Sequence, residues 1–302
     1  MSRRQIISEG LSDKLIWSAV NFSCAGPVTE EIRASIEEYC PVIDYSFDID
    51  HNRSVITLLG SPSEVLEGVV AGVKTAVRLI DLTKHTGAHP RMGAADVIPF
   101  VPLGSSTMAE AVELSRKAGE RLFADCGVPV YFYENSAVRE EYRNLSDLRK
   151  GGFESFAAGG KTPDVGNVPV HPTAGASAVG AREPLIAYNI DFAGDDLEKA
   201  REIAKEIRHI RDAGKDFIGV KALGLYLRSR KIAQLSFNIT RPDECSMGEL
   251  FHFARFRGCP IARSELIGAI RFCDLKKSLT GKADTIEEAA ETAKKELYLD
   301  LN

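Results

Sequence analysis

The sequence predicts an α+β protein built from two related subdomains, each with its elements in the order β-α-β-β-α-β. Two observations predict this class. Apolar runs typical of strands alternate with capped amphipathic stretches typical of helices, and the same order of elements occurs twice along the chain. This order is that of the ferredoxin-like fold. Each subdomain should be an open sheet with helices on one face, and we expect the two uncovered sheets to face each other across a ligand cleft.

The first subdomain is predicted over residues 1–180. Its helices are marked by their first turns: Thr29 is a candidate cap followed by two glutamates, and Ser61 opens the capping box S-P-S-E. Apolar residues then keep helical spacing, as at Ile32 and Ile36. The helices are expected over residues 29–39, 61–80, 107–126 and 137–157, and the strands over residues 15–20, 42–47, 54–59, 96–101 and 128–133.

A Gly/Pro-rich stretch, residues 158–182, follows with few helix or strand signals. A stretch this long inside a compact protein is usually a linker or a binding segment. The second subdomain, predicted over residues 181–302, repeats the first pattern. Its strands are expected over residues 185–192, 217–227, 232–240 and 261–270, and its helices after a cap at Asp195 or Asp196, over residues 246–257, and in the tail 283–301.

Charge and composition exclude several classes of partner. The 302-residue chain has a formal net charge of −5 and a pI near 5.8, which argues against nucleic acid or an anionic membrane as its main partner. The opening MSRRQIISEG lacks the apolar core of a signal peptide, and no apolar run approaches the ~20 residues of a membrane helix. The six cysteines are scattered without a C-x-x-C pair. We therefore expect a cytoplasmic protein with reduced thiols and no metal site.

The stretch KHTGAHPRMGAADVIPF, residues 84–100, is the strongest candidate for an active-site loop. It places two histidines and an arginine between a predicted helix and a predicted strand, in a chain with six histidines. Loops at strand ends are where a rigid scaffold presents its chemistry. We interpret His85 as structural or supporting, and His51 and His171 stay open between ligand contact and a structural role.

Several motifs, in the same order along the chain, resemble those of formiminotransferases. They are NFS at residues 21–23, DHNRSV at 50–55, HPRMGAADVIPFVP at 89–102, GVPVYFY at 127–133, HPTAGASAVGAR at 171–182, LIAYNI at 185–190, KALGLYL at 221–227, AQLSFN at 233–238 and SELIGAI at 264–270. The resemblance implies two facing ferredoxin-like subdomains and the activity of a glutamate formiminotransferase. That activity moves a formimino group from N-formimino-L-glutamate to N5 of tetrahydrofolate, in one-carbon metabolism and histidine catabolism.

The resemblance also implies partners and site residues. In this family folate lies in the cleft between the subdomains, and the protein is a homodimer. The histidine of the family's H-P-R-M/I-G motif maps onto His89, which we expect to be catalytic. The family's folate-contacting segment maps onto Gly166, Asn167, Val168, Pro169, Val170, His171, Pro172, Thr173, Ala174 and Gly175.

The chemistry of the transfer suits these residue types. An imidazole, with an unperturbed pKa near ~6.5, can take a proton from the attacking nitrogen and return one to the leaving nitrogen at neutral pH. Both substrates are acids, and guanidinium groups bind carboxylates in a two-pronged manner. A carboxylate would stabilise the cationic formimino group, although Asp48 and Asp50 could instead cap a hairpin turn. The expected substrate-binding residues are Asp48, Asp50, Asn52, Arg53, Arg91 and Arg182.

Three residues depart from the family pattern. Ala88 precedes the expected catalytic histidine where glutamate is usual, Cys24 stands where the motif NFSEG has glutamate, and Arg271 replaces a proline. The two missing acids leave open a donor other than formimino-glutamate, such as formimino-glycine or a formyl-amino acid. A non-catalytic folate-binding protein is the third alternative. Cys24 has no identifiable base near it, which argues against a nucleophilic role.

Overall fold

The computed structural model of the protein describes residues 5–8, 10–87 and 91–301. Contacts divide the chain into two compact units. The N-terminal unit is Leu11–Arg182, and the C-terminal unit combines Glu183–Asn302 with Met1–Gly10. The start of the chain joins the C-terminal unit through a short strand, β1 (Ile6–Ile7), which pairs in parallel with β12 (Ile270–Arg271).

The N-terminal unit contains a six-stranded sheet in the order β3-β4-β2-β5-β7-β6. Its first four strands in space are antiparallel and have the ferredoxin-like order, which confirms the predicted fold class. Strands β7 and β6 continue the sheet in parallel beyond β5. The strands are β2 (Lys14–Phe22), β3 (Val42–Asp48), β4 (Arg53–Gly60), β5 (Ala95–Gly104), β6 (Val130–Phe132) and β7 (Ser177–Ala181).

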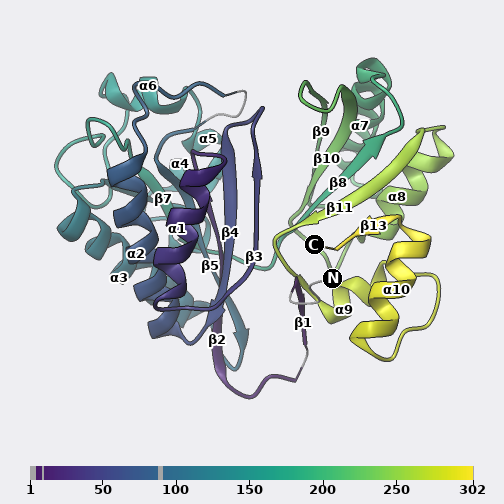
Figure 1. The fold of residues 1–302 in the computed structure, drawn as a ribbon, viewed down its shortest axis with the longest axis horizontal. Coiled ribbons are helices and arrows are strands. Elements are labelled where there is room, and N and C mark those ends of the chain that lie inside the picture. Colours follow the sequence, from purple (N-terminus) through teal and green to yellow (C-terminus); the bar gives the residue numbers. More distant parts are fainter. Residues whose placement is uncertain (1–4, 9, 88–90, 302) are drawn as a thin grey trace. The chain divides into compact units, whose positions relative to one another are not determined.

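Three helices, α1 (Pro27–Glu37), α2 (Pro62–Leu79) and α3 (Met108–Cys126), lie side by side on one face of this sheet (Figure 1). The apolar residues at helical spacing point inward: Ile32 and Ile36 of α1 are fully buried. The capping boxes at Ser61 and Thr107 are both formed. Burial of these apolar stripes against the sheet, rather than intrinsic helix propensity, supplies most of the stability of such helices.

Two predictions for this unit are wrong. Helix α1 begins at Pro27 after Gly26, so Thr29 is a buried residue inside the helix and not its cap; proline is favoured in a first turn because its missing N–H would have no helical partner there. The Gly/Pro-rich stretch also contains a strand. Strand β7 is buried along its whole length between β5 and β6, so it belongs to the sheet's core.

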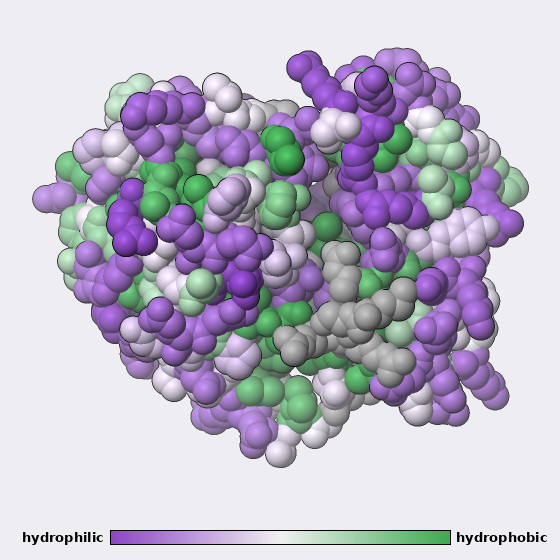
Figure 2. Space-filling view, in the orientation of Figure 1, coloured by the Kyte–Doolittle hydropathy of each residue, from purple (hydrophilic) through white to green (hydrophobic). Residues whose placement is uncertain are grey.

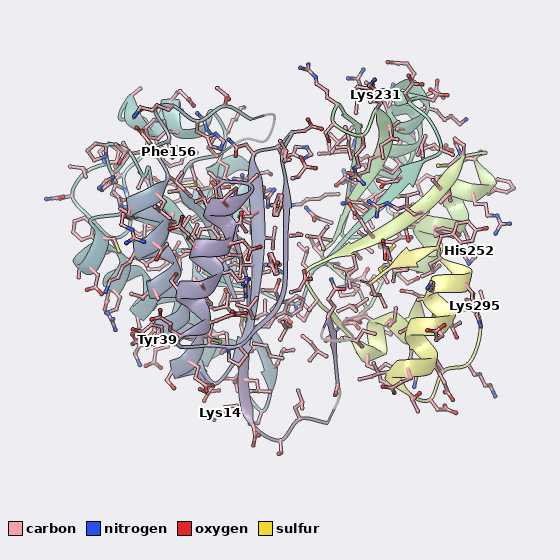
Figure 3. The ribbon with its side chains drawn as sticks, in the orientation of Figure 1. Lys14, Tyr39, Phe156, Lys231, His252 and Lys295 are labelled. Carbon is pink, nitrogen blue, oxygen red and sulfur yellow. The ribbon has the colours of Figure 1, made fainter. Side chains whose placement is uncertain are left out.

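The charged stretch predicted as helical forms three short helices, α4 (Glu140–Arg143), α5 (Leu145–Leu148) and α6 (Gly152–Ala157), after the 3-10 turn η2 (Glu134–Ser136). They carry apolar side chains to a second core, which includes residues of β5, β6 and β7. In it the Tyr131 ring meets the rings of Tyr142 and Phe156 edge-on, at centroid distances of 5.6 and 4.9 Å; Phe156 is labelled in Figure 3. Both faces of this end of the sheet are therefore packed.

The C-terminal unit repeats the ferredoxin-like order, with β13 added beside β11: its sheet runs β13-β11-β8-β10-β9. Asp196, not Asp195, caps α7 by accepting a hydrogen bond from the Lys199 N–H. The predicted last strand ends at Ile267, and the predicted tail helix is shorter and is followed by β13. The elements are β8 (Ile186–Phe192), α7 (Leu197–Asp212), β9 (Val220–Leu227), β10 (Ile232–Ile239), α8 (Met247–Phe256), β11 (Ile261–Ile267), α9 (Phe272–Lys277), α10 (Ile286–Glu296) and β13 (Leu299–Asp300).

The hydrophilic character of the surface agrees with the composition of the chain, in which 27% of residues are charged. On the face seen in Figure 2, hydrophilic residues predominate and hydrophobic ones form separate patches. Within the part of the chain that the structure describes, no helix combines the length and apolar character needed to cross a membrane.

Candidate active site

A β-bulge places a buried carboxylate at the edge of the candidate site. The pairing of β2 with β5 shifts between Asn21 and Phe22, so that Asp96 is an extra residue of β5 with no partner in the register. Bulges of this kind redirect a side chain and occur often beside active sites. Asp96 is nearly fully buried; its Oδ1 accepts a hydrogen bond from the Met92 N–H at 2.8 Å, and its Oδ2 pairs with Nη2 of Arg149.

A second guanidinium lies beside this pair. Arg53, the first residue of β4, donates from Nη2 to the Asn21 side-chain oxygen. Burial, and to a smaller extent the charge of Arg149, lower the pKa of Arg53 to about 10, and the charge of Asp96 opposes both effects. Arg53 therefore remains protonated at neutral pH. Two guanidinium groups around one carboxylate give this cluster a net positive charge, which favours the binding of an anion.

The turn between β3 and β4 is held against the start of the candidate loop. Asn52, in the left-handed conformation with φ of 47°, donates from Nδ2 to the Thr86 carbonyl at 3.0 Å. Nε2 of His85 lies 3.0 Å from the Asn52 carbonyl oxygen. A Cβ at Gly87 would lie 2.5 Å from the His51 carbonyl oxygen, so this close approach requires glycine. We name this arrangement the turn–loop contact.

Asp48 organises the same turn. Its Oδ1 accepts a hydrogen bond from the His51 backbone N–H at 2.8 Å and lies 3.1 Å from the His51 ring Nδ1. Asp48 therefore performs the turn capping that its sequence context allows. Asp50 lies inside the turn itself.

Arg91 is held at the other end of the loop by an exposed carboxylate. Its two terminal nitrogens donate to Glu154 at 3.2 and 2.9 Å, and Nη2 also donates to the His85 carbonyl at 3.3 Å. Hydrogen bonding from Arg91 lowers the pKa of Glu154 below its usual value. Because the Glu154 side chain is 65% exposed, this pair can exchange for a substrate carboxylate at small cost.

These groups surround one pocket of the N-terminal unit, lined by Phe22, Ser23, His51, Asn52, Arg53, His85, Arg91 and Asp96. Three of the six expected substrate-binding residues are therefore brought together: Asn52, Arg53 and Arg91. Asp48 contacts the pocket through His51. Arg182 does not line the pocket and lies near Tyr133, where its charge opposes the effect of burial, which raises the pKa of Tyr133 to about 12.

The sequence analysis misses Asp96 and Arg149 as parts of this cluster, and it assigns His85 only a structural or supporting role. A signal exists for Asp96, because it lies inside the quoted HPRMGAADVIPFVP motif. None exists for Arg149, which follows α5 in a stretch of ordinary charged composition. Ala88 and His89 lie outside the described residues. In the sequence they stand between His85 and Arg91, which both line the pocket.

The segment expected to contact folate packs beside the candidate loop and does not line the pocket. The carbonyls of Thr173 and Ala174 accept hydrogen bonds from the N–H groups of Leu82 and Ala94, both at 2.8 Å. Gly175 has φ of 71°, and a Cβ there would lie 2.2 Å from the Met92 carbonyl oxygen. The segment is thus joined to both sides of the loop, and it is not a free linker. Its exposed residues are Asn167, Val168 and Pro172.

His171 forms a local turn inside that segment. Its Nδ1 accepts hydrogen bonds from the N–H groups of Thr173 and Ala174, at 3.3 and 3.0 Å. Burial lowers the pKa of His171. The neutral form is the one that can accept these hydrogen bonds, so the geometry gives this histidine a structural function.

Cys24 belongs to the hydrophobic core of the N-terminal unit. Its Sγ lies 3.5 Å from Ser54 Oγ and 3.8 Å from Thr29 Oγ1, and burial raises its pKa. A buried thiol with a raised pKa is a poor nucleophile. The departure from the family pattern at this position therefore introduces a core residue that does not line the pocket.

Comparison with known proteins identifies the family. The chain matches the profile of the formiminotransferase domain, N-terminal subdomain, over residues 15–182, and that of the formiminotransferase domain over residues 187–280. It is 43% identical to glutamate formimidoyltransferase of Streptococcus pyogenes over 75% of this chain and 78% of that protein. It is 36% identical to the Thermoplasma acidophilum glutamate formimidoyltransferase over 76% and 78%, and 36% identical to the chicken (Gallus gallus) formimidoyltransferase-cyclodeaminase over 85% and 50%. The chain therefore belongs to the formiminotransferase family and is a transferase of formimino groups.

Proposed function

We propose that this protein transfers the formimino group of N-formimino-L-glutamate to N5 of tetrahydrofolate. The observation that supports this most is the pocket of the N-terminal unit, where arginines predicted to bind substrate meet histidines and a buried aspartate. The relatives named glutamate formimidoyltransferase support the choice of glutamate as the carrier of the group.

Arg53 and Arg91 are the proposed receptors for the carboxylates of the donor. Arg53 carries a buried positive charge and lines the pocket. Arg91 is held by Glu154, an exposed partner that an incoming carboxylate can replace. A charge-assisted, two-pronged contact with guanidinium would orient the donor as well as bind it.

His89 is the proposed general acid and base. The attacking nitrogen has to lose a proton, and the glutamate nitrogen has to gain one, since it would otherwise leave as an amide anion. One imidazole can do both in turn at neutral pH, with a typical contribution on the order of 10²–10⁴-fold. The sequence position of His89, between pocket residues His85 and Arg91, supports this role.

Tetrahydrofolate is the proposed acceptor, with residues 166–175 as its contact segment. The fit rests on two features: exposed side chains at Asn167, Val168 and Pro172, and backbone hydrogen bonds that join Thr173 and Ala174 to the candidate loop. When bound, the folate supplies the nucleophilic nitrogen. We further propose that the protein acts as a cytoplasmic homodimer in histidine catabolism.

Turnover with defined donors tests this function. Purified protein is mixed with tetrahydrofolate and N-formimino-L-glutamate, and formation of 5-formimino-tetrahydrofolate is followed by absorbance. We expect turnover with this donor at a higher kcat/KM than with formimino-glycine or N-formyl-L-glutamate. Preference for another donor would reassign the substrate, and folate binding without turnover on any donor would favour a binding protein.

A further inference from the structure

Buried polar atoms of two residues that line the pocket have no hydrogen-bond partner among the described residues. They are Nδ1 of His85 and Nε of Arg91. The same Arg91 donates from Nη2 to the His85 carbonyl, so the two residues are neighbours. Leaving such groups unpaired costs free energy, so native proteins contain few of them and each calls for an explanation, such as a catalytic role or a partner that binds there.

The neighbours of His85 decide which of its nitrogens carries the proton. Nε2 lies 3.0 Å from the Asn52 carbonyl oxygen, which can only accept, so Nε2 holds the hydrogen and donates. In the neutral ring Nδ1 is then left with a lone pair and no hydrogen. Two neighbouring residues of the pocket lining thus carry one unpaired acceptor, at His85, and one unpaired donor, at Arg91.

A formimino donor matches this pair of atoms. Its protonated formimino group has N–H hydrogens and no lone pair to offer, and its carboxylates can only accept. An N-formyl group of similar size ends in a carbonyl oxygen, which would meet the Nδ1 lone pair with repulsion. A single acceptor at this position therefore distinguishes the two groups by the direction of one hydrogen bond.

We propose that His85 is a specificity-determining residue, whose Nδ1 accepts a hydrogen bond from the formimino N–H of the donor while Arg91 Nε donates to a donor carboxylate. This proposal rests on the proposed function and goes beyond it, because it assigns recognition of the transferred group to a second histidine. His85 acts here in binding, and the proton transfer stays with His89.

Two conservative variants separate this role from the turn–loop contact. In His85→Gln the side-chain nitrogen can occupy the place of Nε2 and keep the hydrogen bond to Asn52, but the acceptor at the Nδ1 position is lost. In His85→Asn the side-chain oxygen can occupy the place of Nδ1, and the hydrogen bond to Asn52 is lost. The matched control is His252→Gln, an exposed histidine of α8 (Figure 3).

The measurements are kcat/KM for N-formimino-L-glutamate and the inhibition constant of N-formyl-L-glutamate. We expect His85→Gln to lower kcat/KM roughly 10- to 100-fold, the range for one hydrogen bond to a charged group, and to tighten inhibition by the formyl compound. His85→Asn should retain more of the kcat/KM than His85→Gln. Both variants should melt within a few degrees of the wild type, as should the control.

Other outcomes overturn the proposal. Equal kcat/KM in all variants would remove any role for His85, and a larger loss in His85→Asn than in His85→Gln would assign the turn–loop contact as its only function. An unchanged ratio between the two ligands would exclude recognition of the transferred group. A wild-type protein that turns over no donor would instead refute the proposed function itself, and the proposal with it.

Discussion

The two units share one strand order and use their buried charges differently. In the C-terminal unit, Asp191 of β8 accepts hydrogen bonds from Arg230, Arg263 and Gln234, at 2.7, 2.9 and 2.7 Å. A second carboxylate, Glu265, accepts from Arg263 and from Asn189 of the neighbouring strand. Both oxygens of Asp191 and both oxygens of Glu265 therefore accept hydrogen bonds within the same unit.

The N-terminal unit has the same kind of charges in an incomplete arrangement. Arg91 pairs with an exposed carboxylate, and His85 Nδ1 has no partner among the described residues. A complete network stabilises its own sheet, whereas an incomplete one has free energy to gain from a ligand. The same fold can therefore serve as scaffold in one unit and as binding site in the other.

The same substitution in both units should expose this difference. In Asp96→Asn the new side chain can still accept from the Met92 N–H, but the buried ion pair with Arg149 is lost. Because the Arg149 side chain is only 14% exposed, we expect the free energy of unfolding to fall by about 3 kcal/mol. Urea denaturation measures this, with donor KM followed in parallel. A loss below about 1 kcal/mol would show that the cluster tolerates an uncompensated charge.

Asp191→Asn should have the smaller effect on stability. Arg230 and Arg263 have side chains 35% and 40% exposed, so both can turn to water once the carboxylate is gone. We expect a loss of about 2 kcal/mol in the free energy of unfolding, and a change in kcat/KM that this loss explains. If kcat/KM fell far more than stability, the network of the C-terminal unit would belong to the site and the contrast between the units would fail.

Glu154→Gln tests whether Glu154 competes with a substrate carboxylate for Arg91. The variant removes the charge that competes with a substrate carboxylate for Arg91. We expect KM for N-formimino-L-glutamate to fall by roughly two- to fivefold with kcat unchanged, as for one weak, exposed ion pair. Glu265→Gln in the C-terminal unit is the matched control. A higher KM in Glu154→Gln would mean that Glu154 positions Arg91 for binding.

The smallest effect should be a pH dependence at His171. Burial lowers its pKa in the folded state, so as pH falls the unfolded chain takes up a proton before the folded one does, and stability decreases below about pH 6.5. In His171→Asn the side-chain oxygen can accept from the same backbone N–H groups without titrating. We expect the wild type to lose more stability than the variant between pH 7 and pH 5, by a few tenths of a kcal/mol. Parallel stability curves for the two proteins over this range would contradict the structural role of a neutral His171.

The fold was largely predictable because alternation and capping report local structure. The capping box at Ser61 is present where the sequence places it. Strand β7 escapes prediction because it is buried between two parallel neighbours, so it shows no alternation and its short Gly/Ala-rich sequence resembles a loop. The two-residue strands β1, β12 and β13 depend on partners far away in the chain, which no local pattern encodes.

The site was predictable only at residues whose side-chain type by itself indicates a binding or catalytic function. Arg53 and Arg91 fit carboxylate binding, and both line the pocket. Asp96 owes its position to a register shift in the sheet, and Arg149, which follows the short helix α5, lies 53 residues later in the chain. Nδ1 of His85 is an acceptor because Nε2 of the same ring donates to the carbonyl of Asn52, 33 residues earlier in the chain. Such roles are set by tertiary contacts, so they become visible only in three dimensions.

The proposal that the N-terminal unit performs the transfer depends on one histidine. Wild type, His89→Ala and the exposed control His252→Ala are compared for 5-formimino-tetrahydrofolate formation at saturating tetrahydrofolate and N-formimino-L-glutamate. We predict that kcat falls on the order of 10²–10⁴-fold in His89→Ala alone, with its melting temperature close to that of the wild type. A kcat in His89→Ala equal to that of the wild type would contradict this account.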